Sequence, residues 1–283
     1  MKRFLTAFAL ASIAFSGAAV AKDFKEGSKV RIATEGAYAP WNFTDSSGKL
    51  DGYEVDLYAD LCERMKVQCD LVQTAWEGII PALQAGKFDA IMAGMSITDK
   101  RKEVITFSRS YMGSPASLVV LKSSPLASLD AGLANISLAD VDAGEKAALD
   151  KIKAALKGKT VGVQISTTHE NFLNEYMADT VTVKTYDTQE NLDLDLGAGR
   201  IDAALASLSY WVPLLEGEKG AKMAMVGPKM DGGPFGNGVG AGIRKDDQEL
   251  ADMFTKAIDA AIADGTISKL SIKWFGFDGT PKD

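Results

Sequence analysis

The sequence predicts an α/β protein with two similar lobes, because one segment occurs twice and strands alternate with helices along the chain. The segment LQAGKFDAIMAGMS, residues 83–96, aligns without a gap with LGAGRIDAALASLS, residues 196–209. Two copies are too few for a repeat array, but they fit two lobes of one construction. Each copy ends where a strand would open into a crevice, which is the usual ligand position in open α/β sheets.

The order of the expected elements favours mainly parallel sheets in both lobes. Residues 29–33 alternate between apolar and polar side chains and predict a first strand, and residues 159–164 echo that strand at the start of the second lobe. The other expected elements are helices over 54–65, 76–83, 169–177, 191–196 and 247–263 and strands over 69–73, 88–93, 117–121, 181–186 and 223–226. This pattern supports two units of similar topology.

The chain is expected to pass between the lobes twice, near residues 112–117 and near residues 228–236. The second passage is rich in Gly and Pro, so we expect a hinge and a cleft that closes. The predicted organisation is a signal peptide over 1–21, a larger lobe from 22–115 plus 232–283, and a smaller lobe over 116–231.

The first residues are typical of a secretory signal peptide. Met1-Lys2-Arg3 is a positively charged start, residues 4–15 are an apolar run, and Ala19-Val20-Ala21 is a small-residue cleavage site. The apolar run is too short to cross a bilayer. We therefore expect cleavage after Ala21 and export to the periplasm. No Cys lies near the cut, which argues against a lipid anchor.

Composition excludes several classes of function. The formal net charge is −7, which argues against nucleic acid or an anionic membrane surface as a partner. With a single histidine and two cysteines the chain has no ligand set for zinc, so neither a metal nor a cofactor is expected. In an oxidising compartment Cys62 and Cys69 are expected to form a disulfide, with two buried thiols as the alternative.

The first copy leads into a possible anion site. Thr98 is expected to cap a helix, with Asp99 in its first turn and Arg101 on it. The strand end would then bring free N–H groups, a helix N-terminus and a guanidinium to one place, which suits a carboxylate. The alternative is a capped helix with a solvated arginine.

Four segments carry a resemblance to a known family: GYEVDL at 52–57, AGKFDAIMAGMSITDKR at 85–101, GKTVGVQ at 158–164 and GTISKLSIKWF at 265–275. Together they resemble the family-3 extracellular solute-binding proteins, which serve ABC importers of polar amino acids and opines. The resemblance implies a two-lobed periplasmic binding protein fold of type II, a small-molecule ligand, an inner-membrane ABC permease as partner and a monomer. Cys62 and Cys69 stand where the lysine/arginine/ornithine and histidine binders carry a short disulfide.

The resemblance also implies a ligand site, residue by residue. Arg101, with the backbone of Gly94 and Ser96 after Ala93, would bind a ligand carboxylate. Tyr38 and Trp76 would sandwich the ligand side chain, and Glu35 stands where binders of basic amino acids hold an acid. Ser166 and Thr167 would lie at the anion site of the second lobe. Trp41 is expected in the wall or core, and Asp89 and Asp202 are expected to tie turns.

Ser207 departs from the family pattern, because amino-acid binders usually have an aspartate there for the α-ammonium. A charge-assisted contact of that kind contributes about 1.5–3 kcal/mol. A ligand whose α-nitrogen is substituted needs it less, and His169 could donate to an additional carboxylate. These features fit octopine or nopaline, with a basic amino acid as the alternative. The segment IATEGAYAPWNF at 32–43 also resembles the opine binders.

Two other functions fit parts of the sequence. Ser166 and His169 could form a nucleophile–base pair, and cyclohexadienyl dehydratases share the implied fold. However, a nucleophile also needs a third group that orients its base, and no acid is implied. A receptor sensing module would need a membrane-spanning or DNA-binding segment, which the sequence does not contain after the leader. We therefore expect a binding protein and no enzyme.

Overall fold

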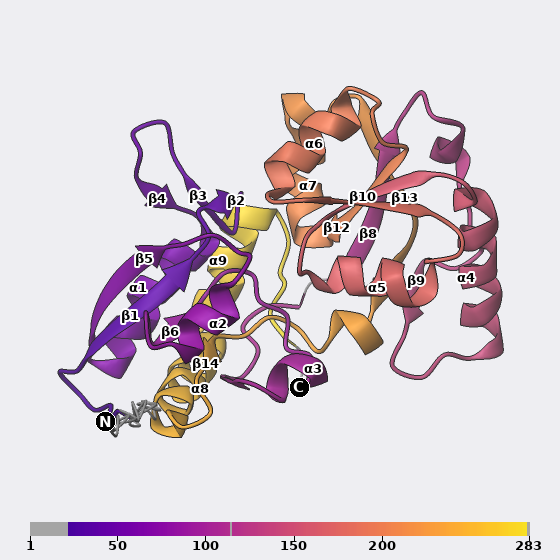
Figure 1. Ribbon diagram of the computed structural model, residues 1–283. Helices are drawn as coiled ribbons and strands as arrows, with labels where there is room; N and C mark the ends of the chain where they lie inside the picture. The colour runs from indigo at the N-terminus through magenta and orange to yellow at the C-terminus, as the bar shows by residue number, and fades with distance from the viewer. Residues whose placement is uncertain (1–21, 114, 282–283) are drawn as a thin grey trace, which may run out of the picture.

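The computed structural model describes residues 22–113 and 115–281, so the leader predicted over 1–21 lies outside the described residues. The chain forms two lobes, each built on one open sheet (Figure 1). The first lobe contains the sheet with strand order β5-β1-β6-β14-β7, and the second lobe contains the sheet with order β11-β10-β12-β8-β13-β9. A three-stranded sheet, β2-β3-β4, adds to the first lobe.

The elements of the first lobe come from both ends of the described chain. Its strands are β1 (Lys29–Thr34), β2 (Ala37–Tyr38), β3 (Asn42–Thr44), β4 (Leu50–Asp51), β5 (Gln68–Gln73), β6 (Ala90–Ile91), β7 (Thr106–Phe107) and β14 (Gly242–Ile243). Its helices are α1 (Tyr53–Met65), α2 (Ile79–Gln84), α3 (Asp99–Lys102), α8 (Gln248–Ala263) and α9 (Thr266–Phe275).

The elements of the second lobe are continuous in sequence. Its strands are β8 (Ala116–Leu121), β9 (Asn135–Ser137), β10 (Thr160–Gln164), β11 (Thr182–Tyr186), β12 (Ala203–Ser207) and β13 (Met223–Asp231). Its helices are α4 (Ala143–Leu156), α5 (Thr168–Tyr176), α6 (Gln189–Gly197) and α7 (Leu208–Glu216), with 3-10 turns over Pro125–Ser128, Glu218–Gly220 and Gly233–Phe235. The exact lobe boundaries stay a prediction.

Both sheets follow one plan. Strand β1 pairs in parallel with β5 and β6, and β10 pairs in parallel with β11 and β12. The next strand is antiparallel in each sheet, β14 in the first lobe and β8 in the second. Each of these strands directly follows a passage from the other lobe. The sheets are therefore parallel where predicted and become mixed where the chain re-enters a lobe.

The two copies of the repeated segment play the same structural part. Asp89 accepts a hydrogen bond from the Arg31 N–H of β1 at 3.0 Å, and Asp202 accepts one from the Thr160 N–H of β10 at 2.8 Å. In each lobe the aspartate thus ties the start of its own strand to the first strand of the sheet. The expectation that both residues hold turns together agrees with these contacts. The first copy forms a shorter strand than predicted, Ala90–Ile91.

Apolar side chains cover both faces of each sheet. In the first lobe one cluster lies under α1, α8 and α9, and a second cluster contains Trp76, Ile79 and Leu83. In the second lobe α4 and α5 cover one face, while α6 and α7 cover the other. Helix α7 is not predicted by any sequence pattern above, because Pro213 lies inside it and its residues are mostly apolar. It packs Tyr210 and Trp211 into the lobe.

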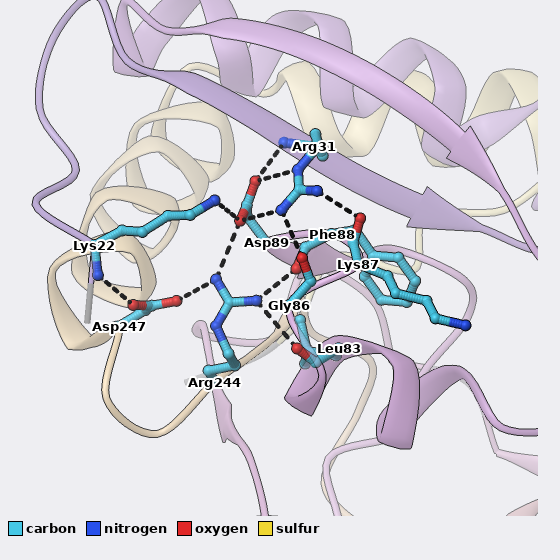
Figure 2. Close-up of polar contacts among 9 residues, drawn as sticks. All are labelled: Lys22, Arg31, Leu83, Gly86, Lys87, Phe88, Asp89, Arg244 and Asp247. Atoms are coloured by element: carbon cyan, nitrogen blue, oxygen red, sulfur yellow. Dashed lines mark hydrogen bonds and ion pairs between the residues drawn. The ribbon is translucent and has the colours of Figure 1, made fainter. Parts of the chain in front are cut away.

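A group of charges around two buried carboxylates, Asp89 and Asp247, holds the start of the described chain against the first lobe (Figure 2). Asp89, which is fully buried, binds Arg31, Arg244 at 3.1 Å and the Lys22 ammonium at 2.7 Å. Asp247 binds Arg244 at 2.5 Å and accepts a hydrogen bond from the Lys22 backbone N–H at 3.1 Å. The two guanidinium groups also donate to the carbonyls of Leu83, Gly86, Lys87 and Phe88.

Three segments meet at the hinge between the lobes. Val239, three residues after the second predicted passage, forms β-bridges with Met112 of the first passage and with Ser96. A Cβ at Gly236 would lie 2.2 Å from the Ile97 carbonyl oxygen, so only glycine fits there. The tail after α9 adds an unexpected third segment, since the Gly113 N–H donates to the Gly279 carbonyl at 2.9 Å.

The expected Cys62–Cys69 disulfide is present and joins the end of α1 to β5. Among residues 22–113 and 115–281, no helix is both long and apolar enough to cross a membrane. No group of acidic, histidine or cysteine side chains in the same residues could hold a metal ion.

Candidate functional site

A cavity lies between the lobes, at the carboxyl ends of β1, β6, β10 and β12, where a ligand is expected in open α/β sheets. Every predicted ligand-binding residue except Ser166 lines it. The first lobe and the hinge contribute Glu35, Tyr38, Trp41, Trp76, Ala93, Gly94, Ser96, Arg101 and Val239, and the second lobe contributes Ala116, Gln164, Thr167, Thr168, His169, Gln189, Ser207 and Phe235.

Arg101 is positioned by the turn that follows the first copy of the repeat. Thr98 caps the short helix α3, as predicted, by accepting a hydrogen bond from the Arg101 N–H. The Arg101 Nη1 donates to the Ser96 carbonyl at 2.9 Å, and its guanidinium lies over the Trp76 ring, 5.3 Å from the centroid. The group is therefore held in place by neutral partners.

The Arg101 guanidinium has no acidic partner among the described residues. Its second nitrogen, Nη2, reaches across to the Ser166 carbonyl at 3.4 Å. Burial lowers the pKa of Arg101 to about 10, which is the cost of holding this charge away from water. A carboxylate brought to this position would stabilise the guanidinium strongly. Arg101 is thus not the fully solvated helix arginine of the alternative, and the anion site stays a prediction.

Glu35 is the complementary group. It follows β1, is 7% exposed, and accepts a hydrogen bond from the Gln164 Nε2 of the second lobe at 2.6 Å. Burial raises the pKa of Glu35 to about 7, against the opposing effect of the Gln164 hydrogen bond, and the negative charges of Glu54, Asp187 and Glu190 raise it further. No cation pairs with Glu35 among the described residues. A cationic group in the cavity would satisfy it.

The backbone of Gly94 differs from the expectation. Its N–H donates to the buried carboxylate of Glu54 at 2.8 Å, so this N–H is not free to bind a ligand carboxylate. Glu54, at the start of α1, also accepts from Asn42 and Tyr111. Gly94 still lines the cavity, with the Tyr38 ring 3.6 Å from where a Cβ would lie. Gly94 therefore leaves room in the cavity beside the Tyr38 ring, because it has no side chain.

The second lobe presents the start of α5. Thr167 caps α5 by accepting from the Glu170 N–H, and its own hydroxyl donates to the Gln164 carbonyl at 2.7 Å. The Thr167 hydroxyl proton is therefore already used. Ser166 does not line the cavity and contributes its carbonyl to Arg101. Burial, together with the Arg101 charge, lowers the pKa of His169 to about 3. His169 is therefore neutral near pH 7 and could donate from one ring nitrogen.

The two lobes touch each other around the cavity. The Tyr38 and Ser207 hydroxyls are hydrogen-bonded at 2.5 Å, and the Trp76 indole N–H donates to the Ile165 carbonyl at 3.1 Å. Trp41 is both wall and core, as expected: it is 1% exposed, and its indole N–H donates to the Ser209 hydroxyl at 3.0 Å. The structure is thus a closed form, in which the predicted cleft is shut.

Residues 30–277 match the family model of the bacterial extracellular solute-binding proteins, family 3. The chain belongs to this family. Each lobe of this solute-binding protein thus supplies one side of a ligand cavity, in agreement with the predicted two-lobed fold.

Individual relatives agree with the family. The octopine-binding periplasmic protein of Rhizobium meliloti is 43% identical over 270 residues, covering 89% of this chain and 92% of the relative. The L-arginine-binding protein of Pseudomonas aeruginosa is 37% identical over 258 residues, covering 90% and 91%. A crystal structure of a periplasmic His/Glu/Gln/Arg/opine family-binding protein from Silicibacter pomeroyi in complex with lysine has a TM-score of 0.71 and 33% identity, covering 89% of this chain and all of that one.

These three relatives are named as binding proteins, so the dehydratase alternative is not favoured. In the described residues no hydrogen bond joins the Ser166 hydroxyl to His169, which a nucleophile–base pair would need. Six further residues of the cavity wall were not predicted: Ala116, Gln164, Thr168, Gln189, Phe235 and Val239. Gln164 ends the strand β10, which the sequence pattern locates, but nothing in one sequence marks its amide as the partner of Glu35.

Proposed function

We propose that this solute-binding protein captures a ligand with a guanidinium and more than one carboxylate, of the octopine and nopaline class. One observation carries this proposal: a buried acid, Glu35, and a half-buried guanidinium, Arg101, line the same cavity, and neither has a partner of opposite charge among the described residues. Burying either charge unpaired is costly, so a ligand that pairs with both gains on closure. A basic amino acid is the second candidate, because it too carries opposite charges at its two ends.

The surroundings of Ser207 favour an opine over a plain amino acid. Ser207 is bonded to the Tyr38 hydroxyl and offers no negative charge for an α-ammonium. A ligand whose α-nitrogen carries a substituent with its own carboxylate depends less on such a charge. Neutral His169 is a candidate donor to that second carboxylate. Octopine binding in the Rhizobium meliloti relative supports the same choice.

In this proposal the protein works outside the inner membrane as a monomer and delivers its ligand to an ABC permease. Ligand binds first to the first lobe through Arg101, Trp76 and Tyr38, and the second lobe then closes on it. Contacts that exist only in the closed form shift the population toward that form. Cleavage after Ala21 would leave Lys22 as the first residue, where its backbone nitrogen and side chain both meet buried carboxylates.

Titration calorimetry with octopine, nopaline, arginine and histidine tests the ligand class. The wild-type protein is expected to bind an opine more tightly than arginine. Ser207→Asp should reverse that order, because an added carboxylate attracts a free α-ammonium and repels a second ligand carboxylate. A single charge-assisted contact corresponds to a change of about 10- to 100-fold.

Two outcomes of this calorimetry count against the proposal. Tight binding of arginine by the wild-type protein, with no binding of either opine, would assign the cavity to basic amino acids. Unchanged preference in Ser207→Asp would show that position 207 does not face the α-nitrogen. Ser46→Asp, on an exposed loop of the first lobe, is the control for adding one negative charge at a distance.

The affinity for a ligand with a cationic end should depend on pH through Glu35. In the closed form without ligand, this carboxyl is protonated in about half of the molecules near pH 7, because its pKa there is about 7. A cation favours the carboxylate and lowers that pKa, so binding below pH 7 releases a proton. Affinity should therefore rise from about pH 5 to about pH 7, by at most tenfold per pH unit, and level off above.

Calorimetry in buffers of different ionisation enthalpy counts the released protons directly. Glu35→Gln should weaken binding and remove the pH dependence between pH 5 and 7. In the closed form His169 stays neutral across that range, because burial and the Arg101 charge lower its pKa to about 3. A pH dependence that survives in Glu35→Gln would mean that another group pairs with the ligand cation.

A further inference from the structure

A pair of stacked tyrosines joins the two lobes at the edge of the ligand cavity. Tyr38 of β2 and Tyr210 of α7 have ring centroids 4.8 Å apart and ring planes within 14° of each other. Tyr38 packs against apolar clusters of both lobes. Tyr210 is 3% exposed and does not line the ligand cavity. The stack therefore connects the lobes through one residue that faces the ligand and one that lies behind it.

Tyr210 is held by a carboxylate within its own lobe. Its hydroxyl donates to Asp193 Oδ2 of α6, and the amide of Gln189 donates to Asp193 Oδ1 at 3.2 Å. Asp193 is shielded from water, which raises its pKa to about 6, while the bonds from Tyr210 and Gln189 oppose that rise. Because the hydroxyl is fixed at one end, the Tyr210 ring has a defined plane on which Tyr38 can stack.

The described side-chain hydrogen bonds between the lobes all involve first-lobe groups that line the cavity. Glu35 bonds Gln164, and Trp76 and Trp41 donate to the second lobe from the cavity wall. Substituting any of these side chains would change ligand contacts and lobe contacts together. Tyr210 differs, because it contacts the first lobe without lining the cavity.

We propose that Tyr210 is a positioning residue that holds the lobes closed by stacking on Tyr38, with Asp193 fixing its orientation. This rests on the proposed function, in which ligand is bound between closing lobes. Opening separates the two rings and exposes both to water, so the stack favours the closed form whether or not ligand is present. Tyr210 thereby sets ligand affinity through the open–closed equilibrium.

The variants Tyr210→Leu and Tyr210→Phe separate the parts of this contact. Leucine fills the site without a ring, while phenylalanine keeps the ring and loses the bond to Asp193. Tyr186→Phe is a matched control, because the Tyr186 hydroxyl donates to Asp195 of the same helix α6 at 2.6 Å, entirely within the second lobe. It removes a tyrosine–aspartate bond without touching the first lobe.

Ser46 and Glu216 are exposed and lie on different lobes. Nitroxide labels on Ser46→Cys and Glu216→Cys therefore report the distance between the lobes by double electron–electron resonance spectroscopy. In the ligand-free protein, Tyr210→Leu should shift the distance distribution toward longer distances, with Tyr210→Phe between it and wild type. Dissociation of octopine, or of whichever tested ligand binds, should be about 2- to 10-fold faster in Tyr210→Leu. Tyr186→Phe should match wild type in both measurements.

The proposal is overturned if Tyr210→Leu, folded by circular dichroism, keeps wild-type label distances and dissociation rate. It is also overturned if Tyr186→Phe opens the lobes as much as Tyr210→Phe, because the effect would then come from the second lobe itself. The label distances are measured without ligand. A failure of all tested ligands to bind wild type would therefore count against the proposed function and leave this test intact.

Discussion

Replacing Arg101 with alanine should weaken ligand binding severely while leaving the protein folded. The ligand carboxylate would enter a water-poor cavity without its guanidinium partner, and truncating one member of a buried charge pair costs about 2–5 kcal/mol or more. That cost corresponds to an affinity about 30- to 4,000-fold weaker. Calorimetry at high protein concentration measures the loss.

Thermal unfolding of the ligand-free variant distinguishes a binding role from a structural one. The Arg101 guanidinium has no acidic partner in the described residues, and burial depresses its pKa. Removing it should therefore leave the melting temperature of ligand-free protein unchanged or raise it. Lys100→Ala, on the exposed side of the same short helix, is the control and should bind ligand as wild type does. Near-normal affinity in Arg101→Ala would remove the anchor from the proposed site.

Replacing Asp89 with asparagine should be the most destabilising change of charge in the first lobe. Asp89 is fully buried and carries three cationic partners, Lys22, Arg31 and Arg244 (Figure 2). Breaking a buried ion pair by removing one partner costs about 3–5 kcal/mol, because it leaves buried charge without compensation. At about 2–4 °C per kcal/mol, the melting temperature should fall by about 6–20 °C.

Asp202→Asn is the matched control, because Asp202 occupies the same position in the second copy of the repeat. Its side chain is 39% exposed and bonds the Thr160 N–H and one exposed lysine, Lys159. Asparagine can keep the backbone bond, and exposed pairs contribute about 1 kcal/mol or less. An equal fall in melting temperature for Asp89→Asn and Asp202→Asn would show that the burial of Asp89 contributes nothing to stability.

The stability that the ionised Asp89 contributes should be lost at low pH. Burial alone would raise the pKa of Asp89, but the bonds from Arg31 and Lys22 outweigh it and hold the pKa well below its ordinary value. A depressed folded-state pKa stabilises the fold at pH values above the unfolded pKa of about 3.9. This stabilisation is lost as the pH falls below that value. Unfolding by urea between about pH 2 and 6 should show it in wild type and not in Asp89→Asn.

The parts of the fold that rest on local pattern could be predicted from the sequence. The aligned copies at 83–96 and 196–209 predicted two similar lobes, and Thr98 was a recognisable cap beside Arg101. The match of several segments to a known family supplied the candidate ligand-binding residues, all but Ser166 lining one cavity. These features depend on near neighbours in the chain or on a shared pattern.

The rest depends on contacts between distant residues, which no local pattern encodes. Glu54 accepts a hydrogen bond from the Gly94 N–H, although the two residues are 40 positions apart in the chain. Gln164 donates a hydrogen bond to Glu35 only because the lobes are closed. Helix α7 contains Pro213, so the sequence pattern does not predict a helix there. Without that helix, the position of Tyr210 between the lobes cannot be predicted either. In each case tertiary packing decides what the sequence leaves open.

The tail that follows α9 has a practical consequence for anyone building a ligand sensor from this protein. Gly279 is bonded to Gly113 in the hinge, so the described chain ends beside the pivot, where rotation of one lobe against the other moves atoms least (Figure 1). A fluorescent reporter fused there would barely change its distance to a second reporter at Lys22. Dyes placed on the exposed rims, far from the axis, would convert the same rotation into a large signal.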